Sequence, residues 1–268
     1  MSRRRRKLRA MASDPRFISG IHNYCDRWCE RCPLTSRCLV YAMEQEEGAG
    51  DPAARDITNQ AFWTRMEEIF RETREMLEEL MREHGITLDP ADLDRAAEER
   101  ERHDESDHPC AVAAREYGKA VEEWFGDARS RFQARGEALM RQLRMGLSGA
   151  DPEEEAKRLE DAVEVIRWYQ YQIAVKVMRA AGSARREDEI DVLGDQGDAD
   201  GSAKVALIGI DRCLAAWSDL LRQLPDEEDR ILPLLAALSR LRREVEGAFP
   251  GARAFVRPGF DTGETTAT

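Results

Sequence analysis

Apolar side chains recur at steps of three and four residues along most of this chain, with charged residues between them. That period belongs to an amphipathic helix, because a half-buried strand would instead alternate at every second residue. The sequence shows no strand-like alternation between turn residues, and its candidate helices are 58–84, 90–103, 110–147, 152–181, 202–223 and 227–247. The sequence therefore predicts an all-α fold, an antiparallel bundle of about five to six helices over residues 56–248.

The segment 152–181 has the features of a central helix. Asp151 and Pro152 supply an N-cap and a first-turn proline. From Ala162 onward apolar residues occupy nearly every face, so we expect neighbouring helices on several sides. In the last segment, Pro233 should either kink the helix or mark its first turn.

Four of the six cysteines lie within fourteen residues of one another near the start of the chain. They are Cys25, Cys29, Cys32 and Cys38, in the frame C-x3-C-x2-C-x5-C. Core packing gives no reason for so many thiols in one short segment, whereas a metal ion or an iron–sulfur cluster needs four thiolates that converge on one point. The sequence therefore predicts an N-terminal four-cysteine metal-binding loop within residues 21–48.

The expected compartment supports metal binding. The N-terminus lacks the apolar stretch of a secretory signal. The sequence also has no run of about eighteen apolar residues, the length that a membrane-spanning helix needs. We therefore expect a cytoplasmic protein, in which thiols stay reduced and clustered cysteines bind metal more often than they form disulfides. Cys110 and Cys213 stand alone in apolar helical segments, and we expect them to lie in the core.

The spacing of the cysteines favours a [4Fe-4S] cluster, with structural zinc as the alternative. Structural zinc usually draws on two ligand pairs separated by about a dozen or more residues, whereas one compact run is more typical of a cubane cluster. The stretch Cys29–Cys38, with Pro33 after its middle cysteine, resembles the C-x2-C-x5-C end of the iron–sulfur loop in the endonuclease III and adenine-glycosylase family. That resemblance covers ten residues and implies cluster-ligand roles for Cys29, Cys32 and Cys38. The family places its first cysteine at a different spacing, and this chain has no helix-hairpin-helix glycine motif, so the DNA chemistry is not implied.

The first three cysteines also match the C-x3-C-x2-C frame of radical S-adenosylmethionine enzymes. Enzymes of that family resemble one another in a parallel α/β barrel, for which this sequence has no strands. A fourth cysteine would also block the iron that binds their cofactor. The fold and the motif therefore disagree, and we do not favour this interpretation.

Several residues near the cysteines could support a metal site. A four-thiolate site carries a net charge of about −2, so Arg27, Arg31 and Arg37 are expected to compensate that charge or to bind a partner. His22 could replace one thiolate, although the four sulfurs are better spaced. Tyr24 and Trp28 are expected to shield the site from water.

Charge is distributed unevenly along the chain. Residues 1–41 carry ten Lys and Arg against three Asp and Glu, although the whole chain has a formal net charge of −12. A basic arm on an acidic body can contact nucleic acid or fold onto a protein surface. The predicted parts are a basic flexible arm over 1–20, the cysteine segment over 21–48, the bundle over 56–248 and a disordered tail over 249–268.

A few charged residues interrupt the most apolar helical segments. Buried together they could line a polar pocket, whereas spread out they would form a solvated stripe on each helix. They are Glu164, Arg167, Lys176, Lys204, Asp211 and Arg212. An enzyme would have to use such a pocket around Glu164, Arg167 and Asp211, because the sequence has no Walker loop, dinucleotide fingerprint, nucleophile elbow or H-E-x-x-H motif.

The sequence thus predicts a metal-binding, all-helical protein with a redox-sensing, electron-transfer or interaction role and a protein partner. Four protein thiolates would close the coordination sphere of the metal, so no catalytic residue is assigned. The alternative is a zinc-stapled adaptor or nucleic-acid-binding protein. In it, the loop orders Arg27, Arg31 and Arg37 while residues 3–9 contact phosphates.

Overall fold

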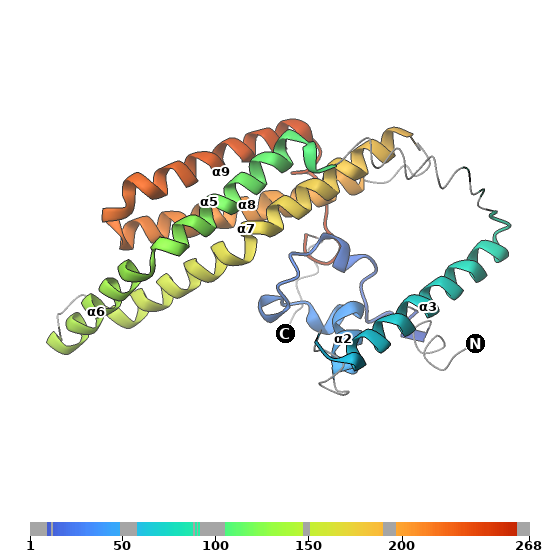
Figure 1. Cartoon of the computed structure of the whole chain (residues 1–268), viewed down its shortest axis with the longest axis horizontal. Coiled ribbons are helices and arrows are strands. Elements are labelled where there is room, and N and C mark those ends of the chain that lie inside the picture. Colours follow the sequence, from blue (N-terminus) through green and yellow to red (C-terminus); the bar gives the residue numbers. More distant parts are fainter. Residues whose placement is uncertain are drawn as a thin grey trace. The chain divides into compact units, whose positions relative to one another are not determined.

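The computed structural model describes residues 10–11, 13–48, 58–87, 89, 91, 105–146, 151–189 and 197–261. Within these ranges the regular structure is helical and no strand occurs, so the predicted all-α class is confirmed. The described residues hold seven α-helices (Figure 1): α2 (Leu39–Gly48), α3 (Gln60–Glu83), α5 (Pro109–Asp127), α6 (Arg129–Met145), α7 (Pro152–Glu189), α8 (Asp198–Gln223) and α9 (Glu228–Ala248). None of the helices in these ranges combines the length and apolarity that crossing a bilayer requires.

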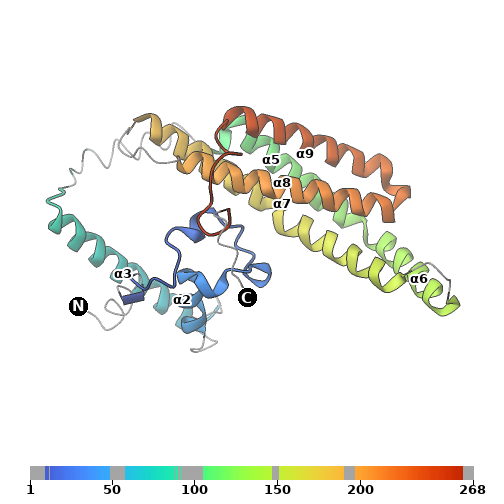
Figure 2. The ribbon, with the colours of Figure 1, turned by 180° about the vertical axis from the view of Figure 1, so that it is seen from behind.

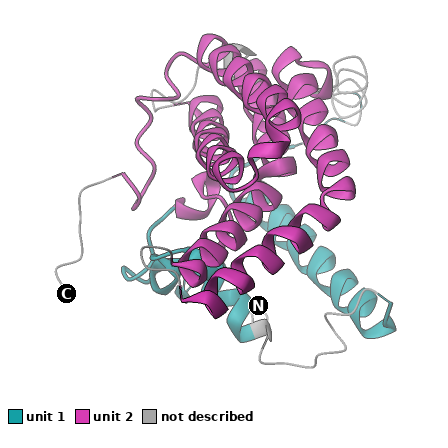
Figure 3. Ribbon diagram, turned by 90° about the vertical axis from the view of Figure 1, so that its left-hand side faces the viewer, with its two compact units in different colours: residues 1–19, 29–104 teal, residues 20–28, 105–268 magenta. Residues whose placement is uncertain are grey.

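The chain divides into two compact units (Figure 3). Unit 1 comprises Met1–Ser19 and Cys29–Asp104, and unit 2 comprises Gly20–Trp28 and Glu105–Thr268. This division departs from the predicted one in two places. The boundary falls inside the cysteine segment 21–48, and α3 belongs to unit 1 rather than to the bundle predicted over 56–248.

Four helices of unit 2 form an antiparallel, up-and-down bundle (Figures 1 and 2). Helix α5 packs against α7 and α9, and α8 packs against the same two helices, so each helix has a neighbour on two sides. Helix α6 follows α5 closely and lies along α7. The predicted antiparallel bundle is therefore present, built in the described part of unit 2 from α5 to α9.

The core of unit 2 follows the helical period of the sequence. On α7, Ile166, Tyr169, Ile173 and Val177 lie three or four residues apart and are at most 1% exposed. Helix α7 contacts α5, α6 and α8, as expected for a central helix. Its opposite face is open to solvent, since Val175 is 55% exposed. Helix α7 is therefore covered by neighbouring helices on fewer sides than its apolar pattern predicted.

Local capping sets the starts of two helices. The side chain of Asp151 accepts the backbone N–H of Glu154 at 3.0 Å, and α7 begins at Pro152, as the sequence predicted. Helix α5 begins at Pro109 after His108, whose Nδ1 accepts the backbone N–H of Cys110 at 3.2 Å. Each cap satisfies an N–H that has no partner within its helix.

Other helix boundaries differ from the predicted ones. The helix predicted over 110–147 is interrupted at Ala128, where α5 ends and α6 begins. Pro233 lies inside α9, beyond its first turn. The candidate helix 90–103 lies outside the described residues, apart from residue 91.

The first part of the predicted disordered tail 249–268 is ordered in the structure. Residues 249–261 form turns, and Phe249, Ala252 and Phe255 are at most 5% exposed. Lys204 of α8 pairs with Asp261 at 3.0 Å. The sequence missed this order because the segment has no helical period, and contacts with distant residues hold it in place. Residues 262–268 lie outside the described part of the chain.

Gly201 of α8 lies where the segments before and after the bundle meet. The rings of Tyr24 and Phe255 pack with their centroids 4.6 Å apart. A Cβ at Gly201 would come closer than 3.0 Å to both rings. This position therefore requires a residue without a side chain.

We predict that Gly201→Ala lowers the free energy of unfolding by about 2 kcal/mol, because the new methyl group overpacks the site. Gly136→Ala is the matched control, since a Cβ in the middle of α6 meets no atom within 4 Å. That change should raise the free energy of unfolding by about 0.5–1 kcal/mol through helix propensity. Urea unfolding followed by circular dichroism measures both, and an unaltered Gly201→Ala protein would contradict this packing.

Candidate metal centre

The four clustered cysteines lie in a series of short 3-10 turns. Cys25 follows the turn Ile21–Tyr24, and Cys29 begins the turn Cys29–Arg31. Cys38 follows the turn Thr35–Arg37 and directly precedes α2. All four clustered cysteines have intermediate exposure, and they form no disulfides in the structure. Their side chains are therefore available for chemistry.

The unit boundary separates Cys25 from the other three cysteines. Cys25 belongs to unit 2, whereas Cys29, Cys32 and Cys38 belong to unit 1. Among the residues that the structure describes, no group of three or more His, Cys, Asp or Glu side chains is placed to hold a metal ion. The predicted ligand set draws on both units, and the four-cysteine site stays a prediction from the sequence.

In unit 1, backbone hydrogen bonds shape the chain around Cys32. The N–H of Cys32 donates to the carbonyl of Cys29 at 3.2 Å, which closes a tight turn between the two thiols. The N–H of Leu34 donates to Cys32 Sγ at 3.4 Å. Backbone amides directed at sulfur stabilise thiolates and tune the potential of iron–sulfur clusters. This local geometry therefore suits a thiolate at Cys32.

In unit 2, Cys25 lies among basic side chains. Its thiol donates to the carbonyl of His22 at 3.4 Å. Lys176 of α7 is only 8% exposed, and burial lowers its pKa while the nearby Cys25 opposes that shift. Burial also lowers the pKa of His22, and the charges of Arg27 and Arg179 add to the effect. Cys25 therefore lies near Lys176, whose side chain is largely removed from solvent.

The arginines predicted to compensate the metal charge are divided between the units. Arg27 belongs to unit 2, and Arg31 and Arg37 belong to unit 1. Arg27 is exposed and has a φ of 57°, a left-handed conformation that costs a non-glycine residue about 1 kcal/mol. Residues 3–9, on which the nucleic-acid alternative depends, lie outside the described residues.

The segment Gly20–Trp28 is fixed on unit 2 through Asp26, a role that the sequence did not reveal. Its carboxylate accepts the hydroxyl of Tyr169 at 2.5 Å and pairs with Arg212 at 2.7 Å. Its backbone carbonyl accepts the indole N–H of Trp168 at 3.0 Å and the side-chain amide of Gln172. Burial, followed by the bond to Asp26, raises the pKa of Tyr169, so its hydroxyl keeps its proton.

Aromatic packing fixes the same segment. Trp28 is 9% exposed and stacks on Trp168 with the ring centroids 5.0 Å apart. The edge of Tyr169 completes the contact at 6.1 Å. Ile21, at the other end of the segment, is 2% exposed. Trp28, which was predicted to shield the metal site, packs in the core of unit 2 and anchors this segment there.

A second cluster holds the middle of the segment. Arg179 of α7 donates to the carbonyl of Asn23 at 3.1 Å and pairs with Asp198 at 2.6 Å. Ser183 donates to the same carboxylate at 2.6 Å. Burial opposes ionisation of Asp198, but the hydrogen bonds from Ser183 and Arg179 hold its pKa below the usual value. Asp198 therefore stays charged and tied to α7.

The charged residues of the apolar helices make separate contacts. The guanidinium of Arg167 lies over the ring of Phe125 at 4.2 Å. Asp211 pairs with Arg253 at 2.7 Å, on the segment that follows α9. Arg212 and Lys204 hold Asp26 and Asp261, as described above. Asp211, Arg212 and Lys204 therefore anchor the segments before and after the bundle, whereas Arg167 packs within it. These contacts give no support to the catalytic pocket predicted around Glu164, Arg167 and Asp211.

Cys110 and Cys213 lie in the core, as predicted. They are 3% and 0% exposed. Burial raises the pKa of Cys213 to about 12 and also raises that of Cys110. Both thiols are therefore protonated and inert at neutral pH.

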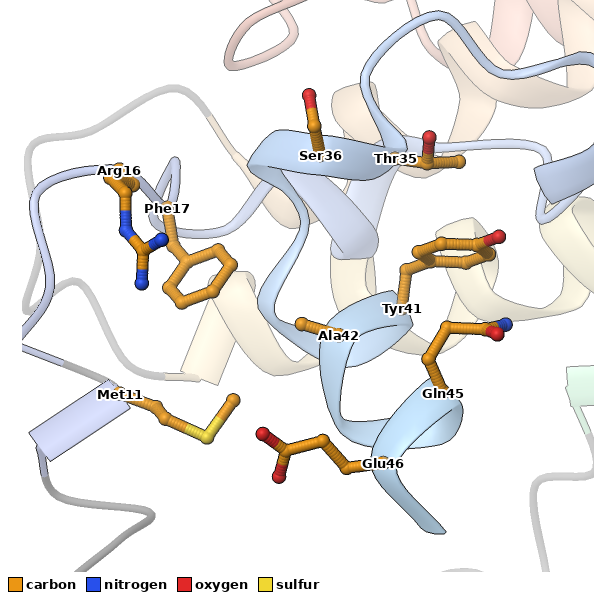
Figure 4. A pocket seen from close by; sticks show the side chains of 9 residues that line it. All are labelled: Met11, Arg16, Phe17, Thr35, Ser36, Tyr41, Ala42, Gln45 and Glu46. Atoms are coloured by element: carbon orange, nitrogen blue, oxygen red, sulfur yellow. The ribbon is translucent and has the colours of Figure 1, made fainter. Parts of the chain in front are cut away.

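A pocket in unit 1 is lined largely by residues of the cysteine segment 21–48 (Figure 4). It has a volume of about 490 Å³, and Phe17, Tyr41 and Ala42 contribute apolar surface to it. The charge of Arg16, on its rim, is already compensated by Asp14 at 2.6 Å. The clustered cysteines are not among the residues that line this pocket. The side chains that line the pocket do not by themselves indicate which chemical reaction or ligand it would serve.

No protein-family model, curated protein or solved structure matches this chain. Its function must therefore be inferred from its own residues.

We predict that thiol labelling separates the cysteines into two classes. In the metal-free native protein, Cys25, Cys29, Cys32 and Cys38 should react rapidly with an aromatic disulfide reagent because they are accessible. Cys110 and Cys213 should react at least about a hundredfold more slowly, because labelling of a buried thiol requires unfolding. Mass spectrometry of labelled peptides assigns each site, and rapid native labelling of Cys213 would contradict the packing described above.

We predict that Trp28→Ala lowers the free energy of unfolding by about 3 kcal/mol, a typical cost of removing a buried tryptophan. The loss of the stack on Trp168 should also release the segment, so trypsin should cleave faster after Arg27. Met140→Ala is the control, because Met140 on α6 is 50% exposed and its removal should cost much less. Equal cleavage of the natural protein and Trp28→Ala would show that Trp28 does not hold the segment.

Proposed function

We propose that Cys25, Cys29, Cys32 and Cys38 bind one [4Fe-4S] cluster, and that this chain is an electron-transfer or redox-sensing protein that acts on a protein partner. The observation that carries the proposal is the contrast between the two classes of cysteine. Four thiols are concentrated in fourteen residues and accessible, whereas the two isolated thiols are buried. Packing in a core accounts for the buried cysteines, but it gives no reason for four accessible thiols in one short segment.

The local surroundings of the thiols support the proposal. The N–H of Leu34 donates to Cys32 Sγ, which stabilises negative charge on that sulfur. Cys25 has Lys176 nearby, and that buried ammonium would offset the charge of a thiolate cluster.

The anchored segment gives the proposed site a link to the helices. Cys25 is adjacent to Asp26, which α7 and α8 hold through Tyr169 and Arg212. Trp28 is adjacent to Cys29 and packs in the core of unit 2. A change at the cysteines would therefore act directly on residues that pack against the bundle. This link supports a sensing role more than a purely stabilising one.

The proposal is tested by anaerobic purification of the full chain. The protein should be brown, with an absorbance band near about 400 nm and iron and sulfide in equal amounts. Cys32→Ser should lose most of the iron, whereas Cys110→Ala, which changes a core thiol, should keep it. A colourless protein with one zinc per chain would overturn the choice of metal, and a protein that holds neither metal would overturn the proposal.

A further inference from the structure

Helix α3 carries an exposed, mostly apolar face that is interrupted at Thr73. Trp63, Phe70, Leu77 and Leu80 are each at least 50% exposed, and none of the residues of α3 is buried. Large exposed apolar patches on a protein surface usually mark an interaction site. The face is long, because a helix of 24 residues extends for about 36 Å.

The face has the repeat of a coiled coil. Its residues alternate at steps of three and four over three heptads, which gives the 3.5-residue period of two supercoiled helices. Trp63, Phe70 and Leu77 occupy the a positions, and Met66, Thr73 and Leu80 occupy the d positions. A helix partner of similar length would cover this face.

The flanking charges select an antiparallel second copy of the same helix. When the a residues of one helix face the d residues of an antiparallel copy, Glu67 at one e position lies beside Arg74 of that copy. The two-fold symmetry repeats this pair on the other side. In a parallel pair, Glu67 and Arg74 would instead face Phe62 and Ile69. Charge complementarity thus arises only in the antiparallel arrangement.

The charge of α3 argues against a lipid surface as the occupant. The helix contains four arginines and seven glutamates. Amphipathic helices that bind membranes are instead rich in Lys and Arg, because the lipid surface is anionic. A net acidic helix would be repelled from such a surface.

We propose that α3 mediates homodimerisation of this protein as an antiparallel coiled coil. The a and d residues bury their apolar surface between the two copies, and the reciprocal Glu67–Arg74 pairs set the orientation. Ile69 lies beside Met76 of the second copy on the opposite flank and widens the apolar seam. The dimer does not depend on the metal.

The test is the mass of the full chain in solution, measured by sedimentation equilibrium at micromolar concentrations. The natural protein should be a dimer. Leu77→Glu should weaken the dimer at least about tenfold, because it places two charges in the apolar seam. Far-ultraviolet circular dichroism checks that the helices remain folded. A protein that is monomeric throughout, or a Leu77→Glu variant that dimerises equally well, would overturn the proposal.

A charge swap tests the orientation. Glu67→Arg and Arg74→Glu should each weaken the dimer severalfold, and the double variant should restore it because each pair is re-formed with exchanged signs. Glu68→Arg is the control, since position 68 points away from the seam in this register. A double variant no better than the singles would exclude the antiparallel arrangement.

Two further measurements separate the alternatives. Cys32→Ser should dimerise normally, so a failure of the metal proposal would leave this one intact. Vesicles of phosphatidylcholine and phosphatidylglycerol should not bind the protein. A monomer that sediments with these vesicles would assign the face of α3 to lipid instead and would overturn the dimer.

Discussion

The structure of unit 2 depends on how Asp26 holds the cysteine-bearing end of the chain. Asp26 joins this segment to both α7 and α8, through its carboxylate and its carbonyl together. Carboxylates with several donors are among the strongest polar anchors, because each bond is charge-assisted. Trp28 adds apolar burial two residues later. Asp26 and Trp28 therefore anchor the same short segment, one through polar and the other through apolar contacts. Cys25 directly precedes Asp26 in the sequence.

Four charged residues of α7 and α8 make the same kind of contact. Arg212, Arg179, Lys204 and Asp211 each bind a residue from outside the bundle, either before its first helix or after its last. Charges in such positions would destabilise a helix interface unless they were paired. Their pairing explains why the most apolar helices retain them.

The all-α class, the ends of α3 and the capped start of α7 follow directly from the sequence, because they depend on local periodicity and on caps within a few residues. The core position of Cys110 and Cys213 follows from the same periodicity. The unit boundary inside the cysteine segment could not be predicted in this way. It arises from contacts between residues more than a hundred positions apart, as between Asp26 and Trp168, and no local pattern encodes such pairs.

The sequence by itself determined which residues could be chemically special: four closely spaced thiols, basic residues around them, and helices with one apolar face. Only the tertiary structure decided which of these residues meet. It placed residues 249–261 against α8, although their composition suggests disorder, because Phe255 packs at Gly201 and Asp261 pairs with Lys204. Spacing along a chain fixes short-range geometry. Long-range contacts are chosen by the burial and pairing that the whole fold allows.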